Sequence, residues 1–364
     1  MSHYDFLIVG CGFYGIVFAR QMTDANKRVL IIEKRDHIGG NCYSEEYQNI
    51  NVHMYGPHIF HTDNTIVWDY VNCFARFNNF INRPKVFYRN KLYSFPINLM
   101  TLYQLWAVKT PAQAQRKLEE SIIPIENPRN MEEWAVSRVG REIYDIFIKG
   151  YTKKQWGKDP RKLPANIIKR LPIRLTFDDN YYSHKYQGIP IGGYTRMFQN
   201  MLDGIDVRLE TDYFDKRSYW DSVADSFVYT GKLDEYFNYK YGELEYRGLK
   251  FEQKTLKGDY QGNAVINYTD EEVPYTRVIE HKHFEFIKNE NTVVTWEYPD
   301  IYDKNKIPYY PVNTTSNNKL YNKYEQEASK ENNLILGGRL AQYKYLDMDQ
   351  VVLAALEMSK RFLR

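Results

Sequence analysis

The run Asp5-Phe6-Leu7-Ile8-Val9-Gly10-Cys11-Gly12-Phe13-Tyr14-Gly15 decides the fold of the N-terminal part of the chain. Its first five residues form the short apolar stretch that is typical of a strand buried in a parallel sheet. A glycine-rich turn follows directly, and a helical stretch runs on towards Ala25. A second apolar run, 28–32, ends at Glu33, so the pattern predicts a strand–helix–strand unit.

The spacing of Gly10, Gly12 and Gly15 at the strand-to-helix turn indicates a dinucleotide site. Gly10 permits the tight turn, Gly12 lets the backbone approach a pyrophosphate, and Gly15 lets helix and strand pack closely. Free N–H groups at the start of the helix can bind the phosphates. Glu33 can accept hydrogen bonds from a ribose diol, as the acid of this motif does. A Rossmann-type domain is therefore expected here.

The glycine motif alone does not distinguish FAD from NAD. A further glycine pair, Gly39-Gly40, follows Glu33, and a strand-then-glycine turn at 334–340 precedes a closing helix from about Met348. A nucleotide domain that begins at the N-terminus and is completed by the C-terminal residues resembles the flavoproteins related to amine oxidases. In those proteins the C-terminal segment closes over the isoalloxazine, so this resemblance favours FAD. No His or Cys stands in a context that assigns an attachment site, so we expect the FAD to be bound non-covalently.

Length and periodicity predict an α/β chain of several domains, because 364 residues exceed the size at which one core usually stops growing. Amphipathic stretches such as 112–121 and 131–148 predict a helical insertion domain. Short alternating segments such as 264–268 and 292–296 predict an antiparallel sheet, joined by the run near 86–95. The expected domains are a discontinuous Rossmann-type FAD-binding domain (1–80, 190–237 and 318–364), a helical domain (97–189, with a mobile substrate loop near 167–181) and a sheet domain (81–96 and 238–317).

Composition excludes several classes of protein. The net charge of +3 is small and the basic residues are scattered, so we expect no nucleic-acid partner. No stretch is long and apolar enough to insert into a membrane, and no signal peptide precedes the first strand. The three cysteines form no CxxC pair, which fits a soluble cytoplasmic protein. The 33 tyrosines suit sugar and nucleobase pockets, although most single rings simply pack in a core.

Several strings along nearly the whole chain resemble the bacterial UDP-galactopyranose mutase family. They occur in the expected order, which makes the resemblance more specific than the glycine motif alone. The matching strings are 55–62, 149–157, 168–170, 179–181, 261–267, 274–281 and 337–340, followed by Tyr345 and Asp347.

The resemblance implies an isomerase that interconverts UDP-galactopyranose and UDP-galactofuranose for the galactofuranose of cell-surface polysaccharides. Substrate and product have the same oxidation state, yet the FAD must be reduced, because N5 of the flavin attacks the anomeric carbon. The resemblance thereby also implies a cellular reductant, and we expect a homodimer.

The resemblance assigns residues to the cofactor, the substrate and catalysis. The predicted catalytic residues are Arg170, Arg277 and His61; the two arginines match those that hold the diphosphate, whose charge rises as UDP is expelled, and a planar guanidinium holds phosphate bidentately. The predicted substrate-binding residues are Asn82, Phe147, Tyr151, Thr152, Trp156, Arg170, Tyr181, Asn267, Arg277, Tyr310 and Tyr345. The predicted cofactor-binding residues are Gly10, Gly12, Gly15, Glu33, Lys34, Arg35, Gly40, Asn41, His58, Ile59, Gly338, Arg339, Asp347 and Met348.

Other interpretations of these residues stay open. His58 and His61 are three residues apart, but no cysteine or carboxylate completes a metal site at ligand spacing, so we expect no metal; the two could also be structural histidines. His281 and His283 are expected in a strand, without assigned chemistry. Alternative functions are a UDP-N-acetylgalactopyranose or bifunctional mutase, a flavin amine oxidase, and a non-catalytic nucleotide-binding module.

Overall fold

The computed structural model describes residues 3–165 and 172–363, and the chain divides into two compact units. The first unit comprises Met1–Asn79, His184–Arg247 and Lys304–Arg364, and the second comprises Phe80–Ser183 and Gly248–Asp303. Most of the helical and sheet segments that the sequence assigns to two domains lie together in the second unit, whereas residues 184–189, 238–247 and 304–317 of those segments lie in the first. The three-domain boundaries stay a prediction. In the described part of the chain, no helix is long and apolar enough to cross a membrane.

A five-stranded parallel sheet forms the centre of the first unit, in the order β16-β10-β1-β2-β9. Helix α1 (Phe13–Asp24) connects β1 to β2, as the glycine motif predicted. This arrangement is the Rossmann-type fold expected from the sequence. The strands are β1 (Tyr4–Val9), β2 (Val29–Ile32), β9 (Asp206–Arg208), β10 (Ala224–Tyr229) and β16 (Leu334–Leu336).

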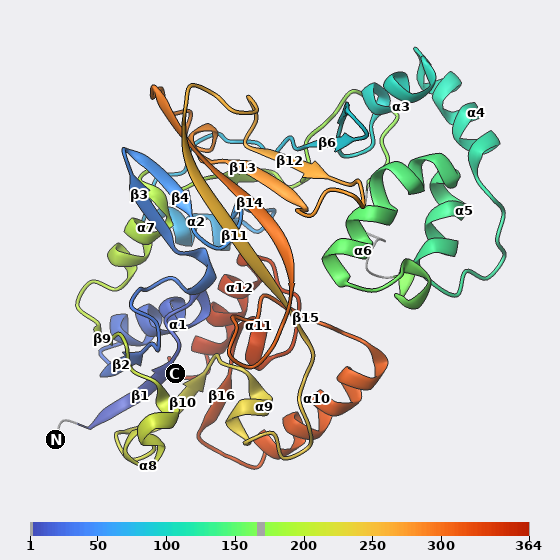
Figure 1. Ribbon diagram of the computed structural model, residues 1–364. Helices are drawn as coiled ribbons and strands as arrows, with labels where there is room; N and C mark the ends of the chain where they lie inside the picture. The colour runs from blue at the N-terminus through green and yellow to red at the C-terminus, as the bar shows by residue number, and fades with distance from the viewer. Residues whose placement is uncertain (1–2, 166–171, 364) are drawn as a thin grey trace. The chain divides into compact units, whose positions relative to one another are not determined.

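Both faces of this sheet are covered by a core. Successive strand residues point to opposite sides, so neighbouring residues belong to different cores. Phe6 and Ile8 belong to a core that includes α1 and α12 (Met348–Ser359), which pack on each other (Figure 1). Leu7 and Leu30 point into a second core, which contains Tyr213 and Trp220. The continuous apolar runs of β1 and β2 in the sequence follow from this two-sided burial.

Shorter elements complete the first unit. The pairs β3-β4 and β5-β8 form two small antiparallel sheets. The elements are η1 (Gly40–Cys42), β3 (Ser44–Tyr47), β4 (Ile50–His53), β5 (Phe60–Thr62), α2 (Thr65–Asn72), β8 (Tyr186–Gly188), α7 (Gly193–Met201), η5 (Tyr213–Lys216), α8 (Arg217–Trp220), α9 (Leu233–Tyr236), β15 (Tyr310–Pro311), α10 (Thr315–Ala328) and α11 (Gly338–Ala341).

Most strands of the larger sheet, which has the order β15-β11-β14-β13-β12-β6-β7, lie in the second unit. Strand β11 begins in the first unit, where Tyr246 and Arg247 pair with β15. The sequence predicted an antiparallel sheet, but β12 and β6 pair in parallel. No hairpin joins these two strands, so the chain connection does not impose an antiparallel direction. The remaining strands are β6 (Lys85–Tyr88), β7 (Lys91–Ser94), β11 (Tyr246–Lys257), β12 (Val265–Tyr268), β13 (Arg277–Glu280) and β14 (Asn291–Ile301).

Helices fill the stretch between β7 and the loop at 172–183. They are α3 (Leu99–Trp106), α4 (Pro111–Ser121), α5 (Met131–Ile143), the wide-turned segment η2 (Tyr144–Lys149), α6 (Gly150–Trp156) and the short turn η3 (Pro160–Lys162). The expected helical stretch at 131–148 is therefore not one regular helix. Gly140 interrupts it with a φ of 77°, and a Cβ there would lie 2.3 Å from the carbonyl oxygen of Ser121, at the end of α4.

Candidate cofactor and substrate sites

The glycine-rich turn between β1 and α1 leaves an open cradle at Gly12. Gly10 has a φ of +106°, and a Cβ there would lie 2.1 Å from Oγ1 of Thr230. A Cβ on Gly15 would lie 2.3 Å from the carbonyl oxygen of Gly10, so α1 and β1 approach too closely for a side chain. Around the Cβ position of Gly12, in contrast, no atom of the described residues beyond Gly12 and its immediate chain neighbours lies within 4 Å. This space at the start of α1 fits a phosphate.

The carboxyl ends of β1, β10 and β16 meet at this cradle. The strand order reverses between β1 and β10, and ligands of open parallel sheets bind at such a reversal. Thr230 follows β10, and its N–H and hydroxyl donate to the carbonyl oxygen of Val9 at 3.1 and 2.9 Å. Gly338 follows β16 and has a φ of +78°. Thr230 therefore shapes the turn, although the sequence analysis did not select it.

Two polar side chains at the end of β2 face the same turn. Glu33 is 7% exposed, and its carboxylate accepts the backbone N–H groups of Cys11 and Arg35 at 2.8 and 3.0 Å. The Arg35 guanidinium lies 4.9 Å from the ring centre of Tyr55 and donates from Nη2 to Oδ1 of Asn41 at 3.0 Å. Its Nη1 is buried and has no hydrogen-bond partner among the described residues. A buried donor of this kind fits a polar ligand group.

Two further predicted cofactor residues lie on the same segment of chain. A Cβ on Gly40 would lie 3.1 Å from Cα of Gly12, so the two glycine turns are in contact. Lys34 is exposed.

The thiol of Cys11 is buried, which raises its pKa to about 12. The thiol is therefore uncharged at neutral pH, and Cys11 packs in the turn.

The histidine segment forms part of the small sheet β5-β8. Nδ1 of His61 lies 2.8 Å from Nδ1 of His184, and burial lowers the pKa of His61. Nδ1 of His58 lies 2.8 Å from the carbonyl oxygen of Gly56, and Ile59 is buried. His61 is thus paired with a second histidine that the sequence analysis did not select, and its catalytic role stays a prediction.

The C-terminal residues of the first unit bring an arginine and two tyrosines together. The rings of Tyr310 and Tyr345 stack with their centres 5.3 Å apart. The guanidinium of Arg339 lies 5.8 Å from the first ring centre and 5.1 Å from the second, and Nη2 donates to the carbonyl oxygen of Leu346 at 2.7 Å. Asp347 then precedes the first turn of α12, where Met348 is the first residue.

In the second unit, η2 and α6 carry four predicted substrate residues: Phe147, Tyr151, Thr152 and Trp156. Phe147 is 4% exposed and stacks on Phe95 with ring centres 6.2 Å apart. Thr152 is also buried, whereas Tyr151 and Trp156 are half-buried. The structure therefore places Phe147 within the apolar core of this unit.

Arg277 and Asn267 are register partners on β13 and β12, and Glu297 is the partner of Arg277 on β14. Nε and Nη2 of Arg277 donate to the Glu297 carboxylate at 2.9 and 2.7 Å, and Glu297 is fully buried. The Nε and Nη2 edge of the Arg277 guanidinium therefore does not offer the expected two-point contact to a phosphate, because the Glu297 carboxylate already binds that edge. A phosphate contact would use other guanidinium hydrogens, and Glu297 fixes their direction.

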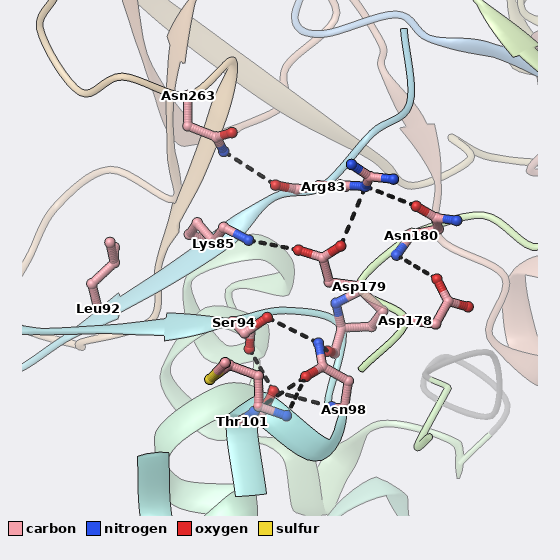
Figure 2. A network of polar contacts seen from close by, with 12 residues as sticks. Arg83, Lys85, Leu92, Ser94, Asn98, Thr101, Asp178, Asp179, Asn180 and Asn263 are labelled. Carbon is pink, nitrogen blue, oxygen red and sulfur yellow. Dashed lines mark hydrogen bonds and ion pairs between the residues drawn. The ribbon is translucent and has the colours of Figure 1, made fainter. Parts of the chain in front are cut away.

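Tyr181 and Asn82 meet through the backbone, where the N–H of Tyr181 donates to the carbonyl oxygen of Asn82 at 2.8 Å. The adjacent Asp179 binds Nζ of Lys85 at 2.8 Å and Nε of Arg83 at 3.3 Å, as Figure 2 shows. Residues 173–176 lie along the turn before α3: N–H of Arg174 donates to Ile97 and N–H of Leu99 donates to Thr176.

Hydrogen bonds hold this turn in place, because the buried Asn98 caps α3 and donates to Oγ of Ser94 (Figure 2). The segment at 173–181 is thus anchored at several points. The mobile loop predicted near 167–181 stays a prediction, and its residue Arg170 lies outside the described residues.

The described residues bring one group of possible metal ligands together, which is not the one considered from the sequence. Ligand atoms of Asp259, Glu280 and His283 lie within 4.8 Å of one another. Glu280 already accepts the backbone N–H groups of Tyr260 and Gln261, both at 2.8 Å, so we assign no metal to this group. His281 and His283 lie in a helical turn, η6 (His281–His283), and not in a strand as expected, because β13 ends at Glu280.

Comparisons with known proteins identify the family of the chain. A model of the UDP-galactopyranose mutase family matches residues 146–345, and a model of the NAD(P)-binding Rossmann-like domain matches residues 8–74. The chain is 43% identical over 369 residues to a dTDP-fucopyranose mutase of Escherichia coli, with 98% of each chain covered. It is 44% identical over 370 residues to a probable UDP-galactopyranose mutase of Klebsiella pneumoniae, covering 100% of this chain and 96% of that protein.

A solved structure agrees with the fold. The crystal structure of reduced UDP-galactopyranose mutase aligns with a TM-score of 0.80 and 16% identity, covering 100% of this chain and 94% of that chain. The fold and the glycine cradle define a protein with a Rossmann-type dinucleotide-binding domain. Within that class, the chain belongs to the UDP-galactopyranose mutase family and is an isomerase.

Proposed function

We propose that the chain is a mutase that interconverts UDP-galactopyranose and UDP-galactofuranose with the help of bound FAD. The full-length identity of 44% to a probable UDP-galactopyranose mutase carries this proposal. Two features of the structure support it: the open cradle at Gly12 and the guanidinium of Arg277, which a buried carboxylate holds in place.

The first unit would hold the cofactor. Gly12 and the start of α1 would accept the pyrophosphate, Glu33 would accept the ribose hydroxyls, and the unpartnered Nη1 of Arg35 would donate to a polar group of the dinucleotide. Reduced FAD, when bound, would supply the nucleophile for the anomeric carbon of the sugar. We assign His58, Arg339 and Asp347 to contacts with the flavin, as the family resemblance predicts.

The second unit would hold the nucleotide end of the substrate. Expulsion of a nucleoside diphosphate from a sugar adds negative charge to a group that is already charged, and a preorganised cation lowers the cost of that charge. Arg277 is such a cation, because Glu297 fixes its guanidinium before any substrate arrives. We assign the same task to Arg170, and contacts with the nucleotide or sugar to Tyr181, Trp156 and the other predicted substrate residues.

A second candidate substrate is dTDP-fucopyranose, because a mutase for that sugar nucleotide is 43% identical to this chain. Identities of 43% and 44% do not separate the two activities. The two sugar nucleotides differ in the base, in the 2′-hydroxyl of the ribose and in the sugar. The acetamido substrate considered from the sequence adds a third possibility. The flavin amine oxidase and the non-catalytic module are not proposed, since the chain belongs to a family of isomerases.

Chromatographic assays of furanose-to-pyranose conversion test the proposal directly. UDP-galactofuranose, dTDP-fucofuranose and the N-acetylated UDP-sugar would each be incubated with dithionite-reduced enzyme. The expected result is the highest kcat/KM for UDP-galactofuranose. A higher value for dTDP-fucofuranose would replace the proposed substrate, and no conversion of any of the three would reject mutase activity. The homodimer, the cellular reductant and the cytoplasmic location remain part of the proposal.

A further inference from the structure

Lys154 in helix α6 is bound by three backbone carbonyl groups of one neighbouring turn. Its Nζ donates to the carbonyl oxygens of Tyr268, Val273 and Tyr275 at 2.8, 3.0 and 2.9 Å. An ammonium group has three hydrogens, so these three acceptors match its capacity. The side chain is partly buried, and all four residues lie in the second unit.

The turn that Lys154 binds connects two strands of the candidate substrate site. Tyr268 ends β12, directly after Asn267, and Tyr275 lies two residues before Arg277 on β13. Val273 lies between them. A single ammonium group therefore fixes both ends of the turn as well as one residue within it.

Two neighbours of Lys154 show how closely α6 packs on this turn. A Cβ on Gly150 would lie 2.1 Å from the carbonyl oxygen of Thr269, so only glycine fits there. Nζ of Lys153 lies 2.5 Å from a carboxylate oxygen of Glu271, but both of these side chains are exposed. Exposed ion pairs contribute little, whereas buried charged groups that lose their partners are costly. Of the two lysines, Lys154 therefore makes the stronger connection.

We propose that Lys154 is a positioning residue that sets the placement of α6 against the β12–β13 turn, and so aligns Tyr151, Thr152 and Trp156 with Asn267 and Arg277. The inference rests on the proposed function, because those five residues are assigned to the substrate. Lys154 itself is not assigned to the substrate or the cofactor. Its effect on the reaction passes through the geometry of the two elements that it joins.

The charge of Lys154 gives this arrangement a pH dependence. Burial lowers its pKa to about 8, and the nearby carboxylates of Asp270 and Glu271 oppose that shift. At neutral pH the group is an ammonium with three hydrogens. Above its pKa it becomes an amine with two hydrogens, so one carbonyl loses its donor. KM for the sugar nucleotide should therefore rise as the pH increases through about 8.

Steady-state kinetics with UDP-galactofuranose on the reduced full-length enzyme test the role of Lys154. Lys154→Met should lower kcat/KM by about 10- to 100-fold, mainly through KM, because misplacement of binding groups by about 1 Å has effects of that size. Lys154→Gln, whose amide has two donor hydrogens, should fall between wild type and Lys154→Met. Lys153→Met is the matched control and should stay within about twofold of wild type. Flavin absorbance should be unchanged in all three variants.

The pH profile separates positioning from a loss of folding. Wild type should show the rise of KM near pH 8, and Lys154→Met and Lys154→Gln should lack it. A wild-type KM in either variant, or the same pH profile in Lys154→Met, would overturn the inference. A wild-type enzyme that converts no sugar nucleotide would instead reject the proposed function. Calorimetric measurement of UDP binding would then test the role of Lys154 alone. Weaker UDP binding is expected only for the Lys154 variants. Equal UDP affinity in wild type and Lys154→Met would reject the positioning role in that case.

Discussion

At the scale of single residues, Arg277 and Glu297 form a pair in which one member is fully buried and the other is partly exposed. Arg277→Ala should lower kcat/KM by about two to four powers of ten, because a preorganised charge is lost at the proposed diphosphate site. It should also destabilise the second unit by about 3–5 kcal/mol, since the buried carboxylate of Glu297 loses its partner. Kinetics and thermal unfolding measure the two effects. Arg277→Lys should recover only part of the activity, because an ammonium cannot form the two-point contact.

The double variant Arg277→Ala/Glu297→Gln serves as the control for folding. Removing the buried charge along with its partner should restore most of the stability without restoring activity. If activity returned together with stability, Arg277 would be a structural residue only. Near-normal kcat/KM in Arg277→Ala would contradict the proposed diphosphate contact altogether.

Glu33 should act on cofactor retention. Its carboxylate accepts two backbone N–H groups within the glycine turn, so Glu33→Ala should distort the turn as well as remove the expected ribose contact. The loss of a hydrogen bond to a charged group costs about 1.5–3 kcal/mol, which corresponds to roughly 10- to 150-fold weaker FAD binding. The ratio of flavin to protein absorbance after gel filtration measures how much FAD each variant retains. The exposed Glu46→Ala is the control, and equal flavin content in both variants would place the ribose elsewhere.

At the scale of elements, the link between β13 and β14 contains a histidine that is neutral in the folded protein. His281 is buried, which lowers its pKa to about 3, and Nε2 lies 2.8 Å from Oγ1 of Thr295. The unfolded chain takes up this proton near pH 6.5, whereas the folded chain takes it up only near pH 3. Below pH 6.5 the unfolded state therefore binds more protons, and stability falls as the pH decreases.

His281→Gln should remove this acid sensitivity, because the amide does not titrate. Between pH 7 and pH 5 the wild type should lose about 2 kcal/mol of stability through His281, and the variant should lose correspondingly less. Urea unfolding at the two pH values provides the measurement. The exposed His3→Gln is the comparison and should behave as wild type. An identical pH dependence in wild type and His281→Gln would show that His281 can be protonated in the folded state.

At the scale of the whole molecule, the proposed reaction needs an electron-rich flavin although it transfers no net electrons. Conversion of UDP-galactofuranose should be much faster with dithionite-reduced enzyme than with fully oxidised enzyme, because the oxidised flavin cannot act as the nucleophile. Flavin absorbance records the redox state during the assay. Equal rates in both states would leave the change of ring size to protein side chains alone.

Much of the architecture could be predicted from the sequence, because it depends on patterns among residues that are close together in the chain. Strands β1 and β2 and helix α1 follow from apolar runs and glycine spacing within about thirty residues, where chain connectivity leaves few alternatives. The break in the helical stretch at Gly140 was missed, since amphipathic periodicity does not reveal the contact with Ser121. The parallel pairing of β6 with β12 was also missed, because it depends, like the contact at Gly140, on segments that are distant in sequence.

The sequence by itself determined the nucleotide cradle, the family and the residue types at the site, because these depend on spacing and on strings of neighbouring residues. Only the tertiary structure decided which partners those residues have. Glu297 beside Arg277, His184 beside His61, Thr230 beside Gly10 and the three carbonyl groups around Lys154 come from chain positions far from the residues that they contact. Hydrogen bonds and ion pairs act over a few ångströms of space, and separation along the chain does not report that distance.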